Sequence, residues 1–427
     1  MRTSIMPEVS VVSCSVADPS RWGIFRGSFR RLLGTWLMYS VVFEASLFGS
    51  GQMLHFGSVT LKMILLGVCI LYTLLSLFCG DTISMGSTLL LSYFLAAIAS
   101  AAAIGLVQEA QPRLIGEDIS SQLYLLILPF FELTMRTKRE LAVALRIIMF
   151  SSMLIAFAYV VVMTGLWTGS ISMGDLYRLL VDNGDVIYDE LAGRIFYKGS
   201  LYLGVAVIVF AFWKGRWAKV GLCISFIAVL LTVTRGFVLA LFSVFLLYTL
   251  GKPGRLGAKV ITICILFIVG GMFIPEFFSL AGDKAETDRI RLNTVSQVAE
   301  RMNPLSAMVG HGFGVGVPER PEHMEIAYLE IFHKQGALGL AWFASLGMLL
   351  VLRFRRAIKS GNKHLAYALF LSAVFVFLES LTNPFIDNPI GLSVVIISLV
   401  GLKAIANPID YGVSLHDRKE GAFGYLN

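Results

Sequence analysis

Long apolar stretches recur along this 427-residue chain, and they are the feature that most limits what it can fold into. Each is close to the roughly 20 residues that an α-helix needs to cross a hydrocarbon core about 30 Å thick. Hydrophobic residues make up 56% of the sequence and charged residues only 15%, too few to cover a soluble protein of this size. The sequence therefore predicts an all-α polytopic membrane protein.

About twelve of these stretches are predicted to span the membrane. We place them at residues 33–53, 59–79, 86–107, 120–135, 141–166, 198–213, 217–234, 236–250, 258–275, 336–352, 364–381 and 389–406. Two linkers are much longer than the others, at 167–197 and 276–335. Ordered loops of that length are usually functional, so we expect the chemistry in them.

The charges between the spans predict which side each linker occupies. Arg26, Arg30 and Arg31 precede the first span, and no small-residue cleavage site follows soon afterwards, so this is an uncleaved first helix. The linkers that alternation puts on the same side are basic: 136–140, 214–219, 251–259 and 353–364. The opposite linkers carry most of the acidic loop residues: 108–119, 167–197, 276–335 and 382–388. By the positive-inside rule the basic side and both termini are cytoplasmic.

This topology sets the expected organisation of the chain and explains its net charge of +7. The basic residues lie in short clusters between spans, so they indicate topology and not a nucleic-acid partner. The predicted regions are a cytoplasmic tail 1–32, spans one to nine in 33–275 with the loop 167–197, a large external loop 276–335, spans ten to twelve in 336–406, and a cytoplasmic tail 407–427.

The large loop carries the most informative motifs. Residues 288–304 have helical spacing, 309–316 form a glycine-rich turn, and 323–340 combine a short amphipathic helix with a glycine-marked start of the tenth span. The turn has glycines at alternate positions and no strand before it, so it is not a dinucleotide-binding fingerprint. Such a turn can bring backbone N–H groups and neighbouring cations close to an anion.

Arginines at the external face are the candidate anion ligands. Arg235 ends the seventh span, and Arg289 and Arg291 lie in the loop. A guanidinium donates two parallel hydrogen bonds to phosphate and stays charged at any working pH. The alternative is that Arg235 caps a helix or snorkels, and that the loop arginines pair with nearby acids such as Asp288.

The loop also holds groups that could move a proton. His311, His323 and His333 have spacings that match no zinc signature, so we expect no metal site. Glu325 or an imidazole beside a cleft would suit proton abstraction from a hydroxyl nucleophile. For His311 and His333, the alternative is a solvated loop residue.

Two acids inside predicted spans, Glu44 and Glu132, would suit a proton or ion path and are the main hint of a transporter. Transporters commonly repeat their halves, and the chain has no convincing internal repeat.

Taken together, these motifs resemble the O-antigen polymerase and O-antigen ligase superfamily. The resemblance rests on the order of an Arg before a Pro-containing segment, a GxGxG turn, and the run from Glu325 to Leu340, in which Tyr328 begins the YLxxL-like part. Leu381-Thr-Asn-Pro-Phe385 before the last span is also similar. The ligase branch has a His at the position of Glu325, so the acid here favours the polymerases, whereas His323 two residues earlier keeps the ligase open.

The resemblance implies a GT-C-like, membrane-embedded glycosyltransferase of the bacterial inner membrane that works without a metal or other cofactor. It implies undecaprenyl-diphosphate-linked glycans as substrates, with the large loop in the periplasm, and a chain-length regulator as a protein partner. We expect Glu325, Arg235 and Arg289 to be catalytic. The residues expected to bind substrate are Arg291, His311, His323, Tyr328 and Arg320. Arg291 is the alternative to Arg289, and His323 the alternative base to Glu325.

Three functions follow from these patterns. The first is polymerisation of lipid-linked oligosaccharide repeat units with inversion at the sugar carbon. The second is an O-antigen ligase that transfers the glycan to lipid A-core. The third, from another class, is a polysaccharide flippase or secondary transporter.

Overall fold

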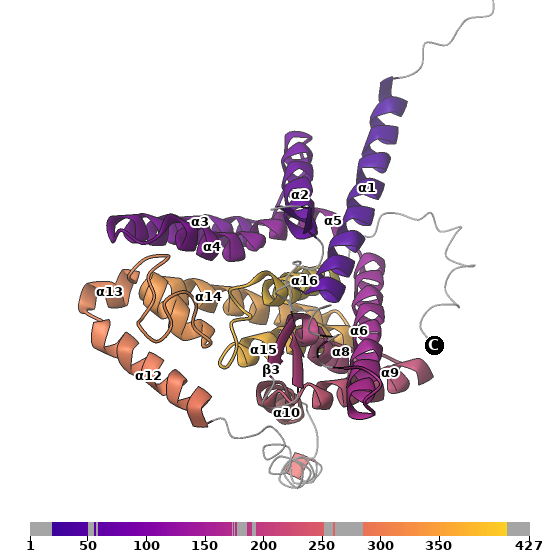
Figure 1. Ribbon diagram of the computed structural model, residues 1–427. Helices are drawn as coiled ribbons and strands as arrows, with labels where there is room; N and C mark the ends of the chain where they lie inside the picture. Colours follow the sequence, from indigo (N-terminus) through magenta and orange to yellow (C-terminus); the bar gives the residue numbers. More distant parts are fainter. Residues whose placement is uncertain are drawn as a thin grey trace, which may run out of the picture.

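The structure of the chain is a computed structural model, and it describes residues 19–49, 55–56, 59–172, 174, 176, 186–189, 194–251, 259–260 and 285–407. Its α-helices are α1 (Pro19–Phe48), α2 (Leu61–Phe78), α3 (Met85–Val107), α4 (Pro112–Gln122), α5 (Leu128–Thr134), α6 (Lys138–Trp167), α8 (Leu201–Phe212), α9 (Arg216–Leu231), α10 (Arg235–Gly251), α12 (Ala285–Arg301), α13 (Pro304–Val309), α14 (Ala327–Lys359), α15 (Lys363–Glu379) and α16 (Pro389–Ala406). The described residues also form two 3₁₀ helices, η1 (Leu123–Ile127) and η3 (Lys198–Ser200). Figure 1 shows their arrangement.

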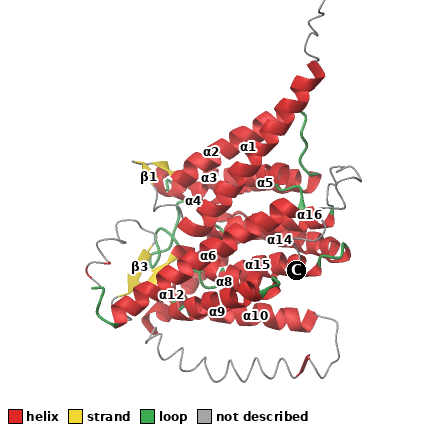
Figure 2. Cartoon of the chain, turned by 90° about the vertical axis from the view of Figure 1, so that its right-hand side faces the viewer, coloured by secondary structure: helices red, strands yellow, loops and turns green. Residues whose placement is uncertain are grey.

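Two short antiparallel hairpins join helices on one side of the bundle. Strands β1 (His55–Phe56) and β2 (Val59–Thr60) connect α1 to α2, and β3 (Val186–Asp189) and β4 (Arg194–Tyr197) precede η3. In β3–β4, Val186 pairs with Tyr197 and Asp189 with Arg194. Both hairpins lie at the same margin of the helices (Figure 2).

The described helices fit an all-α membrane protein. Among the described residues, six segments are long and apolar enough to cross a membrane: Leu61–Phe78, Met85–Val107, Pro112–Thr134, Lys138–Trp167, Ala327–Lys359 and Pro389–Ala406. Two shorter apolar helical segments are Lys198–Phe212 and Arg235–Gly251. The predicted ninth span, 258–275, lies almost wholly outside the described residues. The count of twelve spans therefore stays a prediction.

The core of the bundle is built around α16. Inside the protein, 83% of its residues are buried, against 22% for α2 at the edge. Helices α14 and α15 pack on α16, and α8 packs on α15. In Figure 1, α15 and α16 lie in the middle of the described helices.

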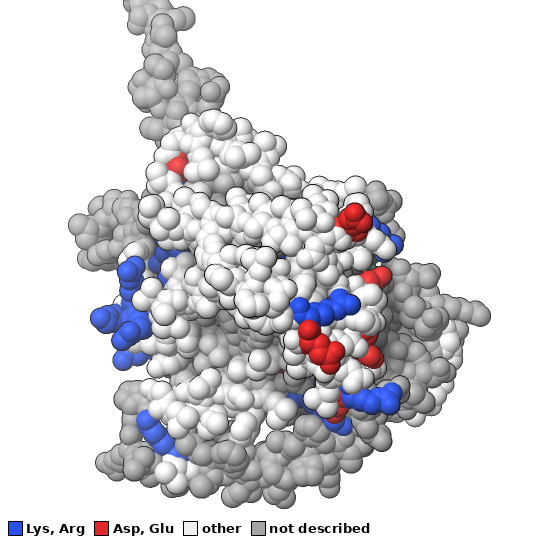
Figure 3. Space-filling view, turned by 90° about the vertical axis from the view of Figure 1, so that its left-hand side faces the viewer, with Lys and Arg blue, Asp and Glu red and all other residues white. Residues whose placement is uncertain are grey.

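The outer surface has the charge distribution of a protein in contact with lipid. In Figure 3, Lys, Arg, Asp and Glu gather at two opposite margins of the visible face, and the broad surface between them is almost free of charge. Large apolar side chains are exposed on the outer helices, such as Leu71 on α2, Leu89 on α3 and Phe157 on α6. Hydrocarbon has no water to solvate a charge, so an uncharged band is what a spanning bundle requires.

Ion pairs tie together linkers that the sequence analysis put on one side. Asp81, between α2 and α3, accepts hydrogen bonds from Arg30 at 2.9 Å and from Arg136 at 3.0 Å. Arg31 lies 3.3 Å from Glu140, in the first turn of α6. Three predicted cytoplasmic segments thus meet at one end of the bundle, although the side of the membrane stays a prediction.

Glu132, the in-span acid that hinted at an ion path, is held by two cations. Its carboxylate lies 2.7 Å from Arg353 on α14 and 3.1 Å from Lys403 on α16, and it accepts a hydrogen bond from Ser87 at 2.7 Å. A carboxylate with so many donors is a structural link between helices and gives the transporter hypothesis no support.

Several helix boundaries differ from the sequence expectation. Helix α1 begins at Pro19, within the predicted tail, and α4 occupies part of the predicted linker 108–119. Helix α14 begins at Ala327, but its backbone breaks at Gly336, where φ is 63°. The break falls at the glycine where the sequence analysis placed the start of the tenth span, and the span itself stays a prediction.

Candidate functional site

The glycine-rich turn packs tightly between two helices. Gly310, Gly312 and Gly314 all have positive φ, at 79°, 90° and 76°. A methyl group on Gly312 would lie 2.2 Å from the backbone nitrogen of Gly105 in α3, and one on Gly310 would lie 2.3 Å from the carbonyl carbon of Lys334 in α14. The alternating glycines therefore let the turn fit between α3 and α14, because a side chain would meet backbone there.

The amides of this turn bind the protein itself. The backbone N–H of His311 donates to the carbonyl of His333 at 2.8 Å, and that of Gly312 donates to the carbonyl of Lys334 at 3.0 Å. The N–H of Phe313 donates to the carbonyl of Ala101 at 2.9 Å, and that of Gly314 donates to Oδ2 of Asp118 at 2.8 Å. The turn was expected to bring N–H groups close to an anion, and the anion that it holds is the carboxylate of Asp118.

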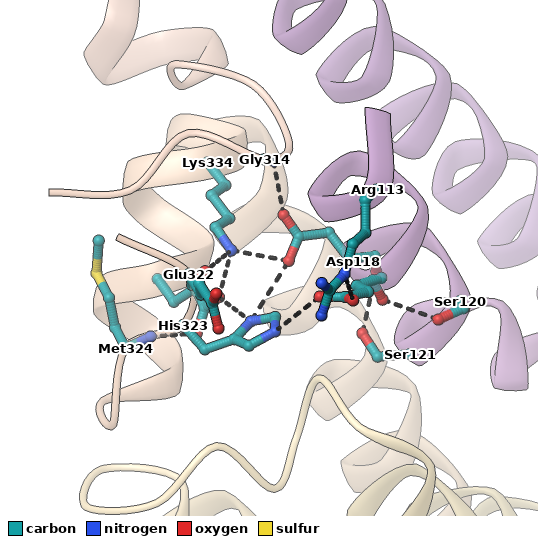
Figure 4. Close-up of polar contacts among 11 residues, drawn as sticks. Arg113, Asp118, Ser120, Ser121, Gly314, Glu322, His323, Met324 and Lys334 are labelled. Atoms are coloured by element: carbon teal, nitrogen blue, oxygen red, sulfur yellow. Dashed lines mark hydrogen bonds and ion pairs between the residues drawn. The ribbon is translucent and has the colours of Figure 1, made fainter. Parts of the chain in front are cut away.

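Asp118 belongs to a buried charged cluster, which we name the Lys334 cluster: Asp118, His323, Glu330 and Lys334. The ammonium of Lys334 lies 2.8 Å from Oδ1 of Asp118 and 2.5 Å from Oε1 of Glu330, and it donates to the carbonyl of Glu322 at 3.0 Å. Figure 4 shows Lys334 and His323 converging on Asp118, which comes from α4. The cluster joins α4 to the start of α14, and it holds the loop that carries Glu322 and His323.

His323 is the member of the cluster that faces solvent, with 51% of its side chain exposed. Its Nδ1 lies 3.3 Å from Oε1 of Glu330 and 3.6 Å from Oδ1 of Asp118, and its Nε2 lies 4.0 Å from Glu117. The hydrogen bond to Glu330 raises the pKa of His323 above its ordinary value, although burial opposes this. An imidazole held through Nδ1 by a carboxylate keeps Nε2 for a substrate hydroxyl, and Glu117, at 4.0 Å, is too far away to bind that nitrogen.

Asp118, His323 and Glu330 place three donor atoms within 4.8 Å of one another. Such a set could hold a metal ion by its chemistry. However, the ammonium of Lys334 already binds both carboxylates and supplies the cationic charge there. The expectation of metal independence stays a prediction.

A second group of charges lines a small open pocket, which we name the arginine pocket. Glu325 accepts a hydrogen bond from Nε of Arg291 at 2.7 Å through one oxygen and pairs with Arg320 through the other. About a third of each side chain is exposed. Thr294, Ile326 and Leu329 complete the lining. Each guanidinium has five N–H donors, so the contacts with Glu325 leave donors for an anion.

Local packing sets the positions of these arginines. Val298 on α12 lies about two turns after Arg291 on the same face of the helix, and it forms a small buried cluster with Val317 and Met324. Arg320 closes a turn in which its backbone N–H donates to the carbonyl of Val317 at 2.9 Å. The loop 317–325 is therefore folded against α12, and this brings the two guanidinium groups to Glu325.

Arg289 and His311 lie outside the arginine pocket. Arg289 is exposed on α12, and positions two apart on a helix point in different directions, so it does not line the pocket with Arg291. The ring of His311 stacks on His333 at 4.6 Å between centroids, and its Nδ1 and Nε2 each lie 3.3 Å from a backbone carbonyl.

Tyr328 and Arg235 lie near the end of α15. The Tyr328 hydroxyl donates to the carbonyl of Phe377 at 2.7 Å. Arg235 is the first residue of α10, and the next residue, Gly236, packs against Glu379 at the end of α15. Glu379 is buried at that end of α15. The segments that carry Arg235 and Tyr328 thus meet at the end of α15.

Comparison with known proteins supports the motif resemblance. No family model matches the chain. Over 235 residues the chain is 26% identical to a protein of Shigella flexneri named O-antigen polymerase. This chain is similar to an O-antigen polymerase. The match covers 53% of the chain and 59% of the relative, so the chain spans somewhat more than half of that protein.

The resemblance to O-antigen polymerases and a place in the membrane are thereby confirmed, as are the apolar helices expected of such a protein. Several residues of the site escaped the sequence analysis. Glu330 and Lys334 are four apart on a predicted helix, a spacing that signals an ion pair. Asp118 gave no such signal, because its partner Lys334 is 216 residues away.

Proposed function

We propose that this protein polymerises lipid-linked oligosaccharide repeat units at the periplasmic face of the bacterial inner membrane. The single observation that carries the proposal is the arginine pocket, in which Arg291 and Arg320 converge at the end of an apolar bundle. A diphosphate leaving group on an undecaprenyl anchor needs cations at that depth. The relative named O-antigen polymerase supports the same reaction class.

In the proposed reaction, a hydroxyl of the acceptor sugar attacks C1 of the donor sugar. The C1–O bond to the diphosphate breaks, the diphosphate leaves with the bonding electrons, and the configuration at C1 inverts. The hydroxyl proton passes to a base of the protein. Arg291, Arg320 and Arg235 stabilise the charge that develops on the diphosphate, and no metal is needed for this. Because Arg291 lines the pocket and Arg289 does not, Arg291 is favoured over Arg289 as the diphosphate ligand.

Two residues compete for the role of base. Glu325 is the acid that the sequence motif favours, but both of its oxygens already accept from guanidinium groups. His323 has a carboxylate on Nδ1, and its Nε2 lies 4.0 Å from Glu117, too far for a hydrogen bond. A general base contributes typically 10²- to 10⁴-fold. Glu325→Gln and His323→Gln should therefore separate the roles: the variant whose turnover falls by about that factor at normal donor affinity identifies the base.

The experiment that tests the function uses purified protein and synthetic undecaprenyl-diphosphate-linked repeat units, with EDTA present. A ladder of lengthening lipid-linked glycans in the absence of lipid A-core supports polymerisation. Transfer of a glycan to added lipid A-core, with no ladder, would support the ligase. Activity that appears only without EDTA would overturn metal independence. Finding neither product, with a correctly folded protein, would overturn the proposal.

A further inference from the structure

Glu379, the last residue of α15, is a buried acid that the proposed reaction does not use. Only 1% of it is exposed. One oxygen, Oε1, accepts hydrogen bonds from Asn383 at 2.6 Å and from Thr382 at 3.4 Å. Within the described part of the chain, Oε2 has no hydrogen-bond partner. A buried oxygen without a partner is costly, so it calls for a role.

The carboxyl faces the first turn of α10. A methyl group on Gly236 would lie 2.6 Å from Oε1, 3.0 Å from Oε2, and 2.6 Å from the hydroxyl of Thr382. An alanine at position 236 would therefore displace the carboxyl of Glu379 from this place. The N–H groups of a first helical turn have no partner within the helix and carry partial positive charge, which favours an oxygen acceptor beside them.

The end of α15 that carries this carboxyl contacts the segment that lines the arginine pocket. Ile326 and Leu329 line that pocket, and Tyr328 lies between them in the sequence. Tyr328, at the start of α14, bonds the carbonyl of Phe377 two residues before Glu379. Phe237, which follows Gly236, packs on Phe375 at 6.0 Å between ring centroids. Glu379 thus lies where α10, α14 and the arginine pocket come together.

We propose that Glu379 is a positioning residue, which holds the first turn of α10 so that Arg235 and Arg291 bind one diphosphate group. Arg235 and Arg291 come from segments 56 residues apart in the sequence, and two guanidinium groups repel each other when they approach. A buried carboxyl fixed between their segments sets the separation of the two groups. The inference rests on the proposed function, in which these arginines bind the leaving group.

The test measures binding of inorganic diphosphate to the purified full chain in detergent, together with KM and kcat for the lipid-linked donor. Glu379→Gln keeps the shape and the contact with Asn383, but puts an N–H donor where Oε2 faces α10. We expect diphosphate affinity to fall about tenfold and KM to rise accordingly, with the thermal midpoint nearly unchanged. Glu379→Asp, which keeps the carboxyl, should recover part of the affinity.

A second variant approaches the same contact from the other helix. Gly236→Ala pushes the carboxyl away and should lower diphosphate affinity as Glu379→Gln does, which keeps the test valid where one variant folds poorly. The matched control is Gly67→Ala on α2, where an added methyl group meets nothing within 4 Å. Glu300→Gln on the exposed face of α12 is the control for loss of an acid.

The outcomes separate this inference from the function on which it rests. Wild-type protein that neither binds diphosphate nor makes polymer would remove the proposed function. Wild-type binding that Glu379→Gln and Gly236→Ala leave unchanged would overturn the positioning role alone. Tighter binding by Glu379→Gln would also overturn it, because Glu379 would then compete with diphosphate.

Discussion

Lys334 donates a hydrogen bond to Asp118 at 2.8 Å, and both side chains are almost fully buried. The pair joins α4 to α14 and also holds the glycine-rich turn, because Gly314 binds the other oxygen of Asp118. A buried pair is strongly destabilising to break when one partner is removed, since the remaining charge is left without compensation.

Lys334→Met should therefore lower folding stability by about 3 to 5 kcal/mol, because it leaves Asp118 and Glu330 buried without their cation. Thermal unfolding in detergent measures the effect. The matched control is Arg113→Met, which breaks a surface pair with Glu117 of the same 2.8 Å length and should leave the thermal midpoint unchanged. Equal effects of the two variants would show that burial of the pair does not matter.

Loss of either guanidinium in the arginine pocket should slow polymer formation. A hydrogen bond to a charged group is worth about 1.5 to 3 kcal/mol, so Arg291→Ala and Arg320→Ala should each reduce the rate by roughly ten- to a hundredfold or more. Lysine at either position should recover only part, since it lacks the planar fork. We expect Arg289→Ala to reduce the rate of polymer formation less. A larger reduction for Arg289→Ala than for Arg291→Ala would make Arg289 the diphosphate ligand.

The raised pKa of His323 makes a pH-dependent contribution to stability. The folded protein holds the proton of His323 more tightly than the unfolded chain, so the contribution is full below the ordinary pKa of 6.5 and is lost as pH rises through the folded pKa. The gap in thermal midpoint between wild type and His323→Gln should close over that window. His364→Gln, at an exposed site on α15, is the control. A gap that widens with pH would contradict the assigned hydrogen bond to Glu330.

Gly312→Ala should destabilise the protein more than an ordinary helical substitution. The left-handed backbone costs an alanine about 1 to 2 kcal/mol, and its methyl group would meet Gly105 at 2.2 Å. Gly67→Ala in α2 should be neutral or stabilise by up to about 1 kcal/mol, because its surroundings are open. The measurement is again the thermal midpoint, and equal midpoints for the two variants would contradict the close packing of the turn on α3.

The large loop is predicted to be periplasmic. In a variant without native cysteines, Ser296→Cys on the exposed face of α12 should react with an impermeant maleimide in intact spheroplasts. Lys359→Cys, at the far end of α14, should react only after lysis. Removing the native thiols matters because Cys79 and Cys223 are exposed. The reverse labelling pattern would invert the topology and place the arginine pocket in the cytoplasm.

The sequence alone determined the helical membrane character of this protein and the motifs of its loop. Apolar length predicted α2, α3, α6 and α16 because crossing hydrocarbon demands about 20 apolar residues regardless of neighbours. The break at Gly336 was also readable, since glycine marks a departure from helical backbone. These features are local, so a single segment carries all of the information.

The tertiary structure decided which charges meet. Asp118 pairs with Lys334, Arg291 and Arg320 share Glu325, and Arg289 lies outside that pocket. None of this follows from spacing, because ion pairs between distant segments depend on how the helices pack. The glycine turn illustrates the same limit: its pattern indicated an anion, and only the folded chain identified that anion as the carboxylate of Asp118.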